Sequence, residues 1–356
     1  MTHPISRREF LKLTGIGVGA YAFRPWKSLL YQADFPEAER LGRVTEGAIK
    51  IRVRPDLAST EVATLYQDQV VVWLREVIGS IPGRLNQRWV ETPEGYVWSA
   101  LLQPVKNIPN LPLENLPVTS LGAGMWVDVT VPYVELYLIN PKPISPSVKS
   151  TIESGKNYRL YFGQIIWVDQ IRVDTDGQTW YRINERFSYG DYFWAPAEAF
   201  RPITEAEIVP ISPNVGEKRV DVNISRQTVS CYEGNNGVFF ARVSTGQIGE
   251  DSETSPGDWF RIWRKMVSSH MTGGTTGGGW DLAGIGWTTL FEGSGIAFHS
   301  TFWHNNFGER MSRGCVNMTP EGARFIFRWT NPVVGYDPGD VTVAGFNGTL
   351  IRVIED

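Results

Sequence analysis

The stretch 297–318 reads AFHSTFWHNNFGERMSRGCVNM and holds one of the chain's two cysteines and two of its four histidines. His299 stands sixteen residues before Cys315, and Gly314 comes directly before the cysteine. A cysteine is mostly protonated at neutral pH, and a neighbouring imidazole that takes its proton makes it nucleophilic. Glycine has no side chain to keep backbone N–H groups away from a substrate carbonyl, so they can stabilise an oxyanion. We therefore expect Cys315 to act as a covalent nucleophile.

The residues after the cysteine predict a helix over 320–329. Thr319 is a suitable N-cap, and Pro320 is favoured at the first helical position. The apolar side of this helix would support the turn that carries the cysteine. Further strands are expected over 341–343 and 349–353, the second of them after an Asn-Gly turn.

The other cysteine lies in a different pattern. Apolar and polar side chains alternate over 220–232, as in strands with one buried face. Cys231 shares the apolar register with Val229, which predicts a small buried side chain and not a second nucleophile. Two cysteines are too few for a disulfide framework. A single bridge between Cys231 and Cys315 remains the alternative to a free catalytic thiol.

Two further segments accompany the 297–318 stretch: 239–246 reads FFARVSTG and 254–262 reads TSPGDWFRI. Together these segments resemble the YkuD-type L,D-transpeptidase family, and the resemblance covers about 206–356. It implies a β-sandwich catalytic domain with a short helix after the catalytic cysteine.

The resemblance also implies roles for individual residues. His299 is the general base, Ser300 orients its imidazole through the backbone, and the amides of Gly314 and Cys315 line the oxyanion hole. The residues that the resemblance or the loop places at the substrate are Arg313, Asn317, Trp303 and His304. Many family members have a second histidine where this chain has Arg313, so the role of that histidine is not carried over. His304 is five residues from His299, which fits a structural or substrate-side position better than a second base.

By resemblance, the cysteine attacks the carbonyl after the third residue of a peptidoglycan stem tetrapeptide, releases D-Ala and passes the acyl group to another stem. The product is a 3→3 cross-link, and the chemistry needs no cofactor. Two alternatives stay open. Water in place of the acceptor amine would give an L,D-carboxypeptidase, and an inactive site would leave a wall-binding protein. We expect a monomer.

A zinc site is the chemical rival, because the three histidines outside the N-terminus and Cys315 are ligand types. Their spacing fits no close-packed zinc pattern, and no Cys-x-x-Cys pair exists. The glycine-rich run 273–279 after His270 lacks the lysine of a phosphate-binding loop. We interpret the segment from Met271 to Ile285 as a candidate lid over the active site.

The N-terminus, residues 1–35, resembles a twin-arginine export signal and linker. Residues 6–12 read SRREFLK, an apolar glycine-rich run follows over 13–23, and residues 20–22 read AYA. The apolar run is shorter than the ~20 residues that cross a bilayer, so we expect no integral membrane domain. Export would place the protein in the periplasm, cell wall or extracellular space, and a retained N-terminal anchor stays open.

The middle of the chain predicts two small β modules, over 40–105 and 122–205. Residues 89–98 read WVETPEGYVW and resemble the closing hairpin of bacterial SH3-like domains, and a similar aromatic, turn and proline pattern recurs near 180–202. The whole chain is therefore expected to be mainly β. A net charge of -4 and a pI near 5.7 give no basic surface for nucleic acid.

Overall fold

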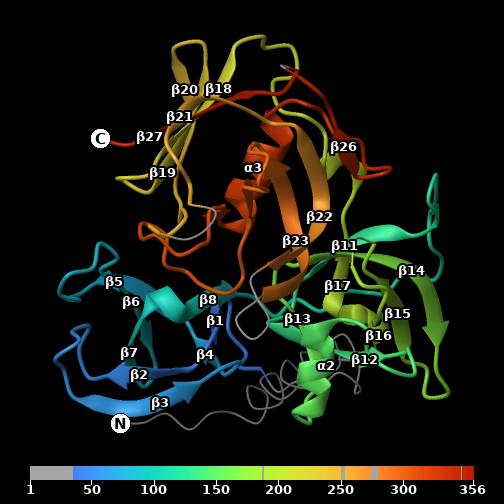
Figure 1. Cartoon of the computed structure of the whole chain (residues 1–356). Helices are drawn as coiled ribbons and strands as arrows, with labels where there is room; N and C mark the ends of the chain where they lie inside the picture. Colours follow the sequence, from blue (N-terminus) through green and yellow to red (C-terminus); the bar gives the residue numbers. More distant parts are fainter. Residues whose placement is uncertain (1–34, 187, 250–252, 274–279, 346) are drawn as a thin grey trace, which may run out of the picture. The chain divides into compact units, whose positions relative to one another are not determined.

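The computed structural model describes residues 35–186, 188–249, 253–273, 280–345 and 347–356. The export signal predicted over 6–23 and most of the glycine-rich run lie outside these residues. The described part is mainly β, as predicted, with two α-helices, α2 and α3 (Figure 1). Within that part, no helix is long and apolar enough to cross a membrane.

The C-terminal region contains two five-stranded sheets that share one core. In spatial order, the first contains β20 (Asn236–Arg242), β19 (Thr228–Glu233), β18 (Lys218–Asn223), β27 (Leu350–Ile354) and β21 (Gly257–Arg261). The second contains β25 (Val316–Met318), β24 (Ala297–Ser300), β23 (Trp280–Leu290), β22 (Arg264–Gly273) and β26 (Asp340–Thr342). Alternate residues of both sheets, among them Val220, Ile351 and Phe298, are buried in a common cluster.

Helix α3 (Pro320–Trp329) contributes its apolar side to this cluster. The predicted helix over 320–329 is confirmed, and the Thr319 side chain caps it by accepting a hydrogen bond from the Gly322 N–H. At the other end, two lysine side chains donate to backbone carbonyls: Lys218 to Trp329 O at 2.7 Å and Lys265 to Thr330 O at 2.8 Å. These donors satisfy carbonyls that have no partner within the helix, so both ends of α3 are fixed.

The first N-terminal module, residues 41–105, consists of two small sheets. One contains β3 (Glu61–Tyr66), β2 (Ala48–Arg52), β7 (Gly95–Trp98), β6 (Arg88–Thr92) and β5 (Arg75–Ile78), and the other β4 (Val70–Val72), β1 (Leu41–Val44) and β8 (Leu102–Val105), after the 3₁₀ turn η1 (Ser99–Leu101). Strands β4 and β5 are separated by two residues, Trp73 and Leu74. The side chain of Trp73, between them, is buried in the core with Val90 and Val97.

The second module, residues 118–208, is built on one seven-stranded sheet. Its order is β13 (Tyr158–Tyr161), β12 (Tyr133–Leu138), β16 (Tyr192–Pro196), β15 (Thr179–Asn184), β14 (Ile165–Val173), β11 (Met125–Val129) and β17 (Phe200–Pro202). The short pair β9 (Val118–Thr119) and β10 (Gly122–Ala123), the 3₁₀ turns η2 (Ala197–Ala199) and η3 (Glu205–Glu207), and helix α2 (Pro146–Glu153) complete it. Sequence reasoning missed α2, although Ser145 caps it and Pro146 stands at its first turn.

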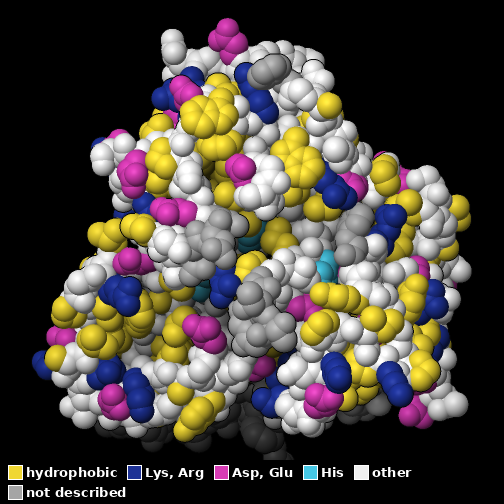
Figure 2. Space-filling view, in the orientation of Figure 1, with side chains coloured by type: hydrophobic (Ala, Val, Ile, Leu, Met, Phe, Trp, Pro, Cys, Tyr) yellow, Lys and Arg dark blue, Asp and Glu magenta, His cyan; other side chains and the backbone are white. Residues whose placement is uncertain are grey.

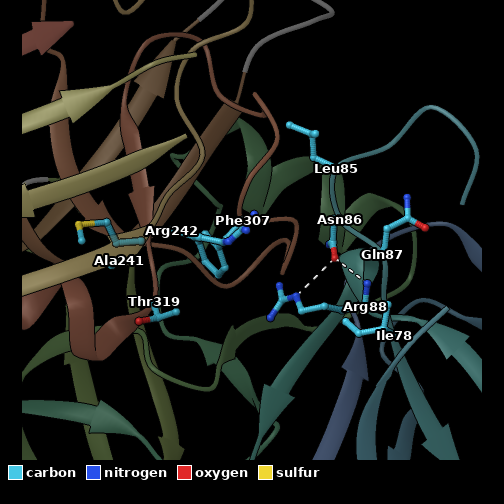
Figure 3. Close-up of a pocket in the computed structure, with 10 residues that line it drawn as sticks. Ile78, Leu85, Asn86, Gln87, Arg88, Ala241, Arg242, Phe307 and Thr319 are labelled. Carbon is cyan, nitrogen blue, oxygen red and sulfur yellow. Dashed lines mark hydrogen bonds between the residues drawn. The ribbon is translucent and has the colours of Figure 1, made fainter. Parts of the chain in front are cut away.

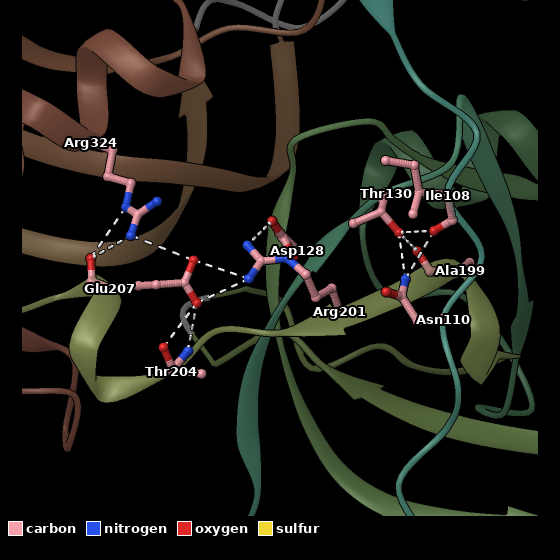
Figure 4. A network of polar contacts seen from close by, with 9 residues as sticks. All are labelled: Ile108, Asn110, Asp128, Thr130, Ala199, Arg201, Thr204, Glu207 and Arg324. Carbon is pink, nitrogen blue, oxygen red and sulfur yellow. Dashed lines mark hydrogen bonds and ion pairs between the residues drawn. The ribbon is translucent and has the colours of Figure 1, made fainter. Parts of the chain in front are cut away.

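A chain of ion pairs joins this module to α3 (Figure 4). The Asp128 carboxylate accepts from Arg201 at 2.8 Å, and Arg201 also donates to the Glu207 carboxylate at 3.0 Å. Arg324 of α3 in turn donates to Glu207 O at 3.1 Å. In the same view Asn110, in the connection between the modules, donates to Thr130 Oγ1 at 2.6 Å. The helix beneath the cysteine turn is thus bound by this module as well as by the two lysines of the C-terminal region.

Removal of the side chain that caps α3 should lower the stability of the fold without changing the predicted catalytic residues. Thr319→Ala leaves the Gly322 N–H without its side-chain acceptor, and we expect the free energy of unfolding to fall by about 1 kcal/mol in chemical denaturation. Thr319→Ser keeps the acceptor and serves as the matched control. Equal losses for both variants would show that the methyl group, not the cap, is responsible.

Candidate active site

The parallel pairing of β24 with β25 brings the two ends of the 297–318 stretch together. Phe298 is paired with Val316 and His299 with Asn317. Phe298 and Val316 point into the core, so His299 and Asn317, on the opposite face, point away from it. Cys315 stands two residues before Asn317 and therefore begins on the same face as His299. The structure thus places the predicted base in β24 and the predicted nucleophile directly before its neighbour β25.

The turn before Cys315 is held by hydrogen bonds within the site. Gly314 has a φ of 133°, a conformation that favours glycine. The Ser312 hydroxyl donates to Cys315 O at 2.6 Å and accepts from the Gly314 N–H at 3.1 Å, while the Thr254 hydroxyl donates to Gly314 O. The Gly314 amide, which the resemblance assigns to an oxyanion hole, is thus bound to Ser312 in this structure. Sequence reasoning gave no role to Ser312 or Thr254.

Gly246, at the end of the 239–246 segment, lies so close to the cysteine turn that a side chain would not fit there. A Cβ added at this position would lie 2.7 Å from both Cα and N of Gly314. The Gly246 N–H also donates to Thr254 Oγ1 at 2.9 Å. The two segments that looked like family landmarks in the sequence therefore meet at the backbone of the cysteine turn.

The imidazole of His299 is held as a neutral base. Its side chain is 2% exposed, and Nδ1 lies 2.9 Å from Ser300 O. A carbonyl oxygen only accepts, so Nδ1 carries the proton and Nε2 has the free lone pair. Burial lowers the pKa of His299 to about 4. The Trp303 ring lies against the imidazole, with 5.7 Å between centroids.

The thiol of Cys315 is also neutral. Burial raises its pKa to about 11, although a hydrogen bond from the Ala297 backbone acts in the opposite direction. Its Sγ lies 3.9 Å from Gly295 O. A thiol with a raised pKa beside an imidazole with a lowered pKa does not form a resting ion pair.

His304 and Asn317 form a buried pair behind this face. The Asn306 N–H donates to His304 Nδ1 at 3.1 Å, so the neutral ring carries its proton on Nε2. That nitrogen lies 2.9 Å from the Asn317 amide nitrogen, while Asn317 Oδ1 has no partner among the described residues. An amide turned to present its oxygen satisfies both groups. Burial lowers the pKa of His304 to about 3. His304 is therefore a neutral side chain whose two ring nitrogens face Asn306 and Asn317.

The other predicted residues lie around the turn or away from it. Arg313 is exposed, with its guanidinium carbon 4.8 Å from the centroid of the Trp280 ring at the start of β23. His270 pairs instead with the carboxylates of Glu185 and Asp281, each at 2.6 Å. Burial opposes the charged form, but these carboxylates raise the pKa of His270 to about 9.

These positions bear on the alternative interpretations. Both cysteines are free, and Cys231 is fully buried, so the alternative of a bridge between them is wrong. Within the described residues, no three His, Cys, Asp or Glu side chains are grouped to hold a metal. The described ends of the 271–285 segment are paired strands of β22 and β23, and its action as a lid stays a prediction.

Figure 2 shows histidine side chains in a hollow at the centre of the face in view. A separate cavity of about 380 Å³ lies between the first module and the C-terminal region (Figure 3). Arg88 and Arg242 enter it from opposite sides. Its lining includes neither Cys315 nor His299.

The comparisons with known proteins concern the C-terminal region. Residues 217–351 match the YkuD family, the L,D-transpeptidase catalytic domain. No curated protein matches the chain.

Solved structures similar to this chain include an Enterococcus faecium L,D-transpeptidase, with 18% identity over 40% of this chain and 51% of that one, and a TM-score of 0.30. Others are an L,D-transpeptidase from Mycobacterium smegmatis (17% identity, 68% and 95% coverage, TM-score 0.31) and one from Mycobacterium tuberculosis H37Rv (15%, 62% and 92%, 0.29). The match spans about half the length of the E. faecium protein.

The resting protonation of the pair can be tested by thiol alkylation. Because burial raises the pKa of Cys315 to about 11, the thiolate fraction should increase about tenfold per pH unit from neutrality to about pH 10. We expect the rate of Cys315 modification by iodoacetamide, followed by mass spectrometry, to contain a part that rises in the same way above a pH-independent part assisted by neutral His299. Cys315→Ser is the control for the buried Cys231. A rate that levels off below about pH 8 would reveal a thiolate–imidazolium pair and contradict the assignment.

The close approach of Gly246 to Gly314 gives a second test. Gly246→Ala should push the cysteine turn away and lower the free energy of unfolding by about 1–3 kcal/mol, with slower alkylation of Cys315. Gly216→Ala is the matched control, because a Cβ there meets open space. Normal alkylation and stability of Gly246→Ala would contradict the packing described.

Residues 217–351 are therefore similar in sequence to the YkuD family, the L,D-transpeptidase catalytic domain.

Proposed function

We propose that the protein is a peptidoglycan L,D-transpeptidase in which Cys315 is the nucleophile and His299 the general base. The observation that carries the proposal is the arrangement of two neutral side chains. His299 lies in β24, and Cys315 lies directly before β25, the strand that pairs with β24. His299 keeps Nε2 free because Nδ1 donates to Ser300 O at 2.9 Å, and the thiol is uncharged until it attacks. This pairing lies within the 217–351 match.

In the acylation step, the Cys315 sulfur bonds to the carbonyl carbon after the third stem residue, and its proton passes to His299 Nε2. The backbone amide of Cys315 stabilises the oxyanion, joined by that of Gly314 once its N–H exchanges Ser312 for the substrate. The intermediate collapses, the C–N bond breaks, and the departing D-Ala amine takes the proton from the imidazolium. A thioester remains on Cys315.

In the second step, an amine of another stem attacks the thioester. It gives a proton to His299, the C–S bond breaks, and the returning proton restores the thiol. The product is a 3→3 cross-link. If water attacks instead, the same thioester yields a tripeptide and the protein acts as an L,D-carboxypeptidase. Neither step requires a bound metal ion or a redox cofactor.

The surroundings of the pair supply candidate substrate contacts. Trp303 is partly exposed beside His299, and Arg313 is exposed two residues before Cys315. We assign both to substrate binding, with Arg313 suited to a carboxylate of the stem peptide. His304 and Asn317 are buried, so we give them the role of shaping the pocket from behind.

We further propose that residues 1–35 export the chain, and that 40–105 and 122–205 are SH3-like modules ahead of a domain over 206–356. The separate cluster around Val90 and Val97 supports the first module. Action on stem peptides would place the protein in the periplasm, in the cell wall or outside the cell.

Mass spectrometry of the intact protein after exposure to a carbapenem tests the nucleophile. We expect one adduct on the wild type and none on Cys315→Ala, with Cys231→Ala as the control that keeps the adduct. Purified tetrapeptide muropeptides test the reaction. Dimers linked 3→3 should accumulate with release of D-Ala, whereas tripeptide without dimers would establish the carboxypeptidase, and no adduct with no turnover would leave a wall-binding protein.

A further inference from the structure

The loop 301–312 joins the predicted base to the predicted nucleophile. Near its start it is contacted by residues of the first N-terminal module as well as by residues of the C-terminal region. We infer that the first N-terminal module positions His299 for catalysis, with the buried side chain of Arg43 as the central contact. This inference rests on the proposed function. It gives the module a part in the chemistry that a spacer would not have.

Arg43 lies in β1 and is 1% exposed. Its Nη2 donates to Phe302 O, in the loop 301–312, at 2.8 Å. Other donors of the same guanidinium go to Gln103 Oε1 at 2.8 and 3.0 Å and to the Asp68 carboxylate at 2.8 Å. A buried guanidinium is costly unless its donors are used. The Phe302 carbonyl is therefore one of the acceptors that this buried arginine needs. The same hydrogen bond fixes the position of that carbonyl.

A series of ring contacts continues from Arg43 to the base. The Arg43 guanidinium carbon lies 4.0 Å from the centroid of the Tyr161 ring, which stacks on Phe302 at 5.3 Å and 20°. Phe302 meets Trp303 edge-on, at 5.1 Å and 89°. The Trp303 ring lies 5.7 Å from that of His299. Tyr161 belongs to β13 of the second module, so all three parts of the structure meet in this series.

The first module also binds the loop further along. The Asn305 N–H donates to Ala100 O at 2.7 Å, and Arg88 donates to Asn305 O at 2.9 Å. The Asn86 amide donates to Asn306 Oδ1 at 3.0 Å. These bonds fix the backbone of Asn305 and the side chain of Asn306, and Arg43 fixes the backbone one residue before Trp303.

His299 depends on this support because its own restraints are few. Its ring hydrogen-bonds to Ser300 O through Nδ1, and Nε2 must stay free to take the proton. Rotation of the imidazole is therefore limited by packing, to which the Trp303 ring contributes. A displacement of a reacting group by about 1 Å can cost on the order of 100-fold in rate. Loss of the contacts at Phe302 would permit such a displacement.

The test uses the full chain and compares Arg43→Met with Val97→Ala. The first substitution keeps apolar volume and removes the bond to Phe302, while Asp68 keeps its pair with Arg159 at 2.9 Å. The second is a core residue of the same module. We expect Arg43→Met to slow carbapenem acylation about 10- to 100-fold with little change in the concentration for half-maximal rate. Val97→Ala should stay within about twofold of wild type.

The same substitution in a His299→Ala background separates positioning from general stability. If Arg43 acts through His299, Arg43→Met should add no further loss there, because the two residues act as a unit. A further loss of equal size, a normal rate for Arg43→Met, or an equal loss for Val97→Ala would overturn the inference. If Arg43→Met does not fold, Tyr161→Leu breaks the ring series instead and must show the same pattern.

Alkylation of Cys315 by iodoacetamide gives a readout that does not need the proposed substrate. Assistance by His299 is the part of the rate lost in His299→Ala, and Arg43→Met should lose that part as well. A wild type that is alkylated with this assistance but never acylated would sink the proposed function and leave the positioning role standing. A rate of alkylation unchanged by Arg43→Met would sink the positioning role alone.

Discussion

The site depends on one short parallel pairing, between β24 and β25. Three register partners set Phe298 and Val316 toward the core and leave His299, Asn317 and Cys315 on the other side. Such a short parallel pair has little stability of its own, and here it is supported on every side. The neighbouring β23 pairs with β24, α3 packs beneath, and Gly246 lies against the turn of Gly314. The catalytic geometry is thus a property of the whole domain.

Much of this site was predictable from the sequence, and the reason is local. A nucleophile turn needs a small residue before the cysteine, a capped helix needs Thr and Pro in order, and a buried cysteine keeps an apolar register. Each of these requirements shows within a few residues, so helix 320–329 and the buried Cys231 were anticipated. The same holds for the mainly β composition. Helix α2 has a comparable signal at Ser145 and Pro146, and it was overlooked among the neighbouring strand patterns.

What the sequence could not show is long-range. Nothing in the segment around Arg43 indicates a bond to Phe302, since 259 residues separate them. The role of Gly246 was equally hidden, because its neighbour Gly314 comes from the other end of the domain. The state of the ionisable groups was hidden too. Burial moves the pKa of His299 down and that of Cys315 up, and burial is a result of packing that residue spacing does not record.

The position of β27 has a consequence for how the domain is made. This strand lies between β18 and β21, parallel to the first and antiparallel to the second, although it comes last among the strands of the domain (Figure 1). Its Ile351 and Val353 are buried in the core. The position of β27 between β18 and β21 therefore stays unfilled until residue 354 has been synthesised. Folding of the catalytic domain has to follow translation of nearly all of it, and a nascent chain would carry two unpaired strand edges until then.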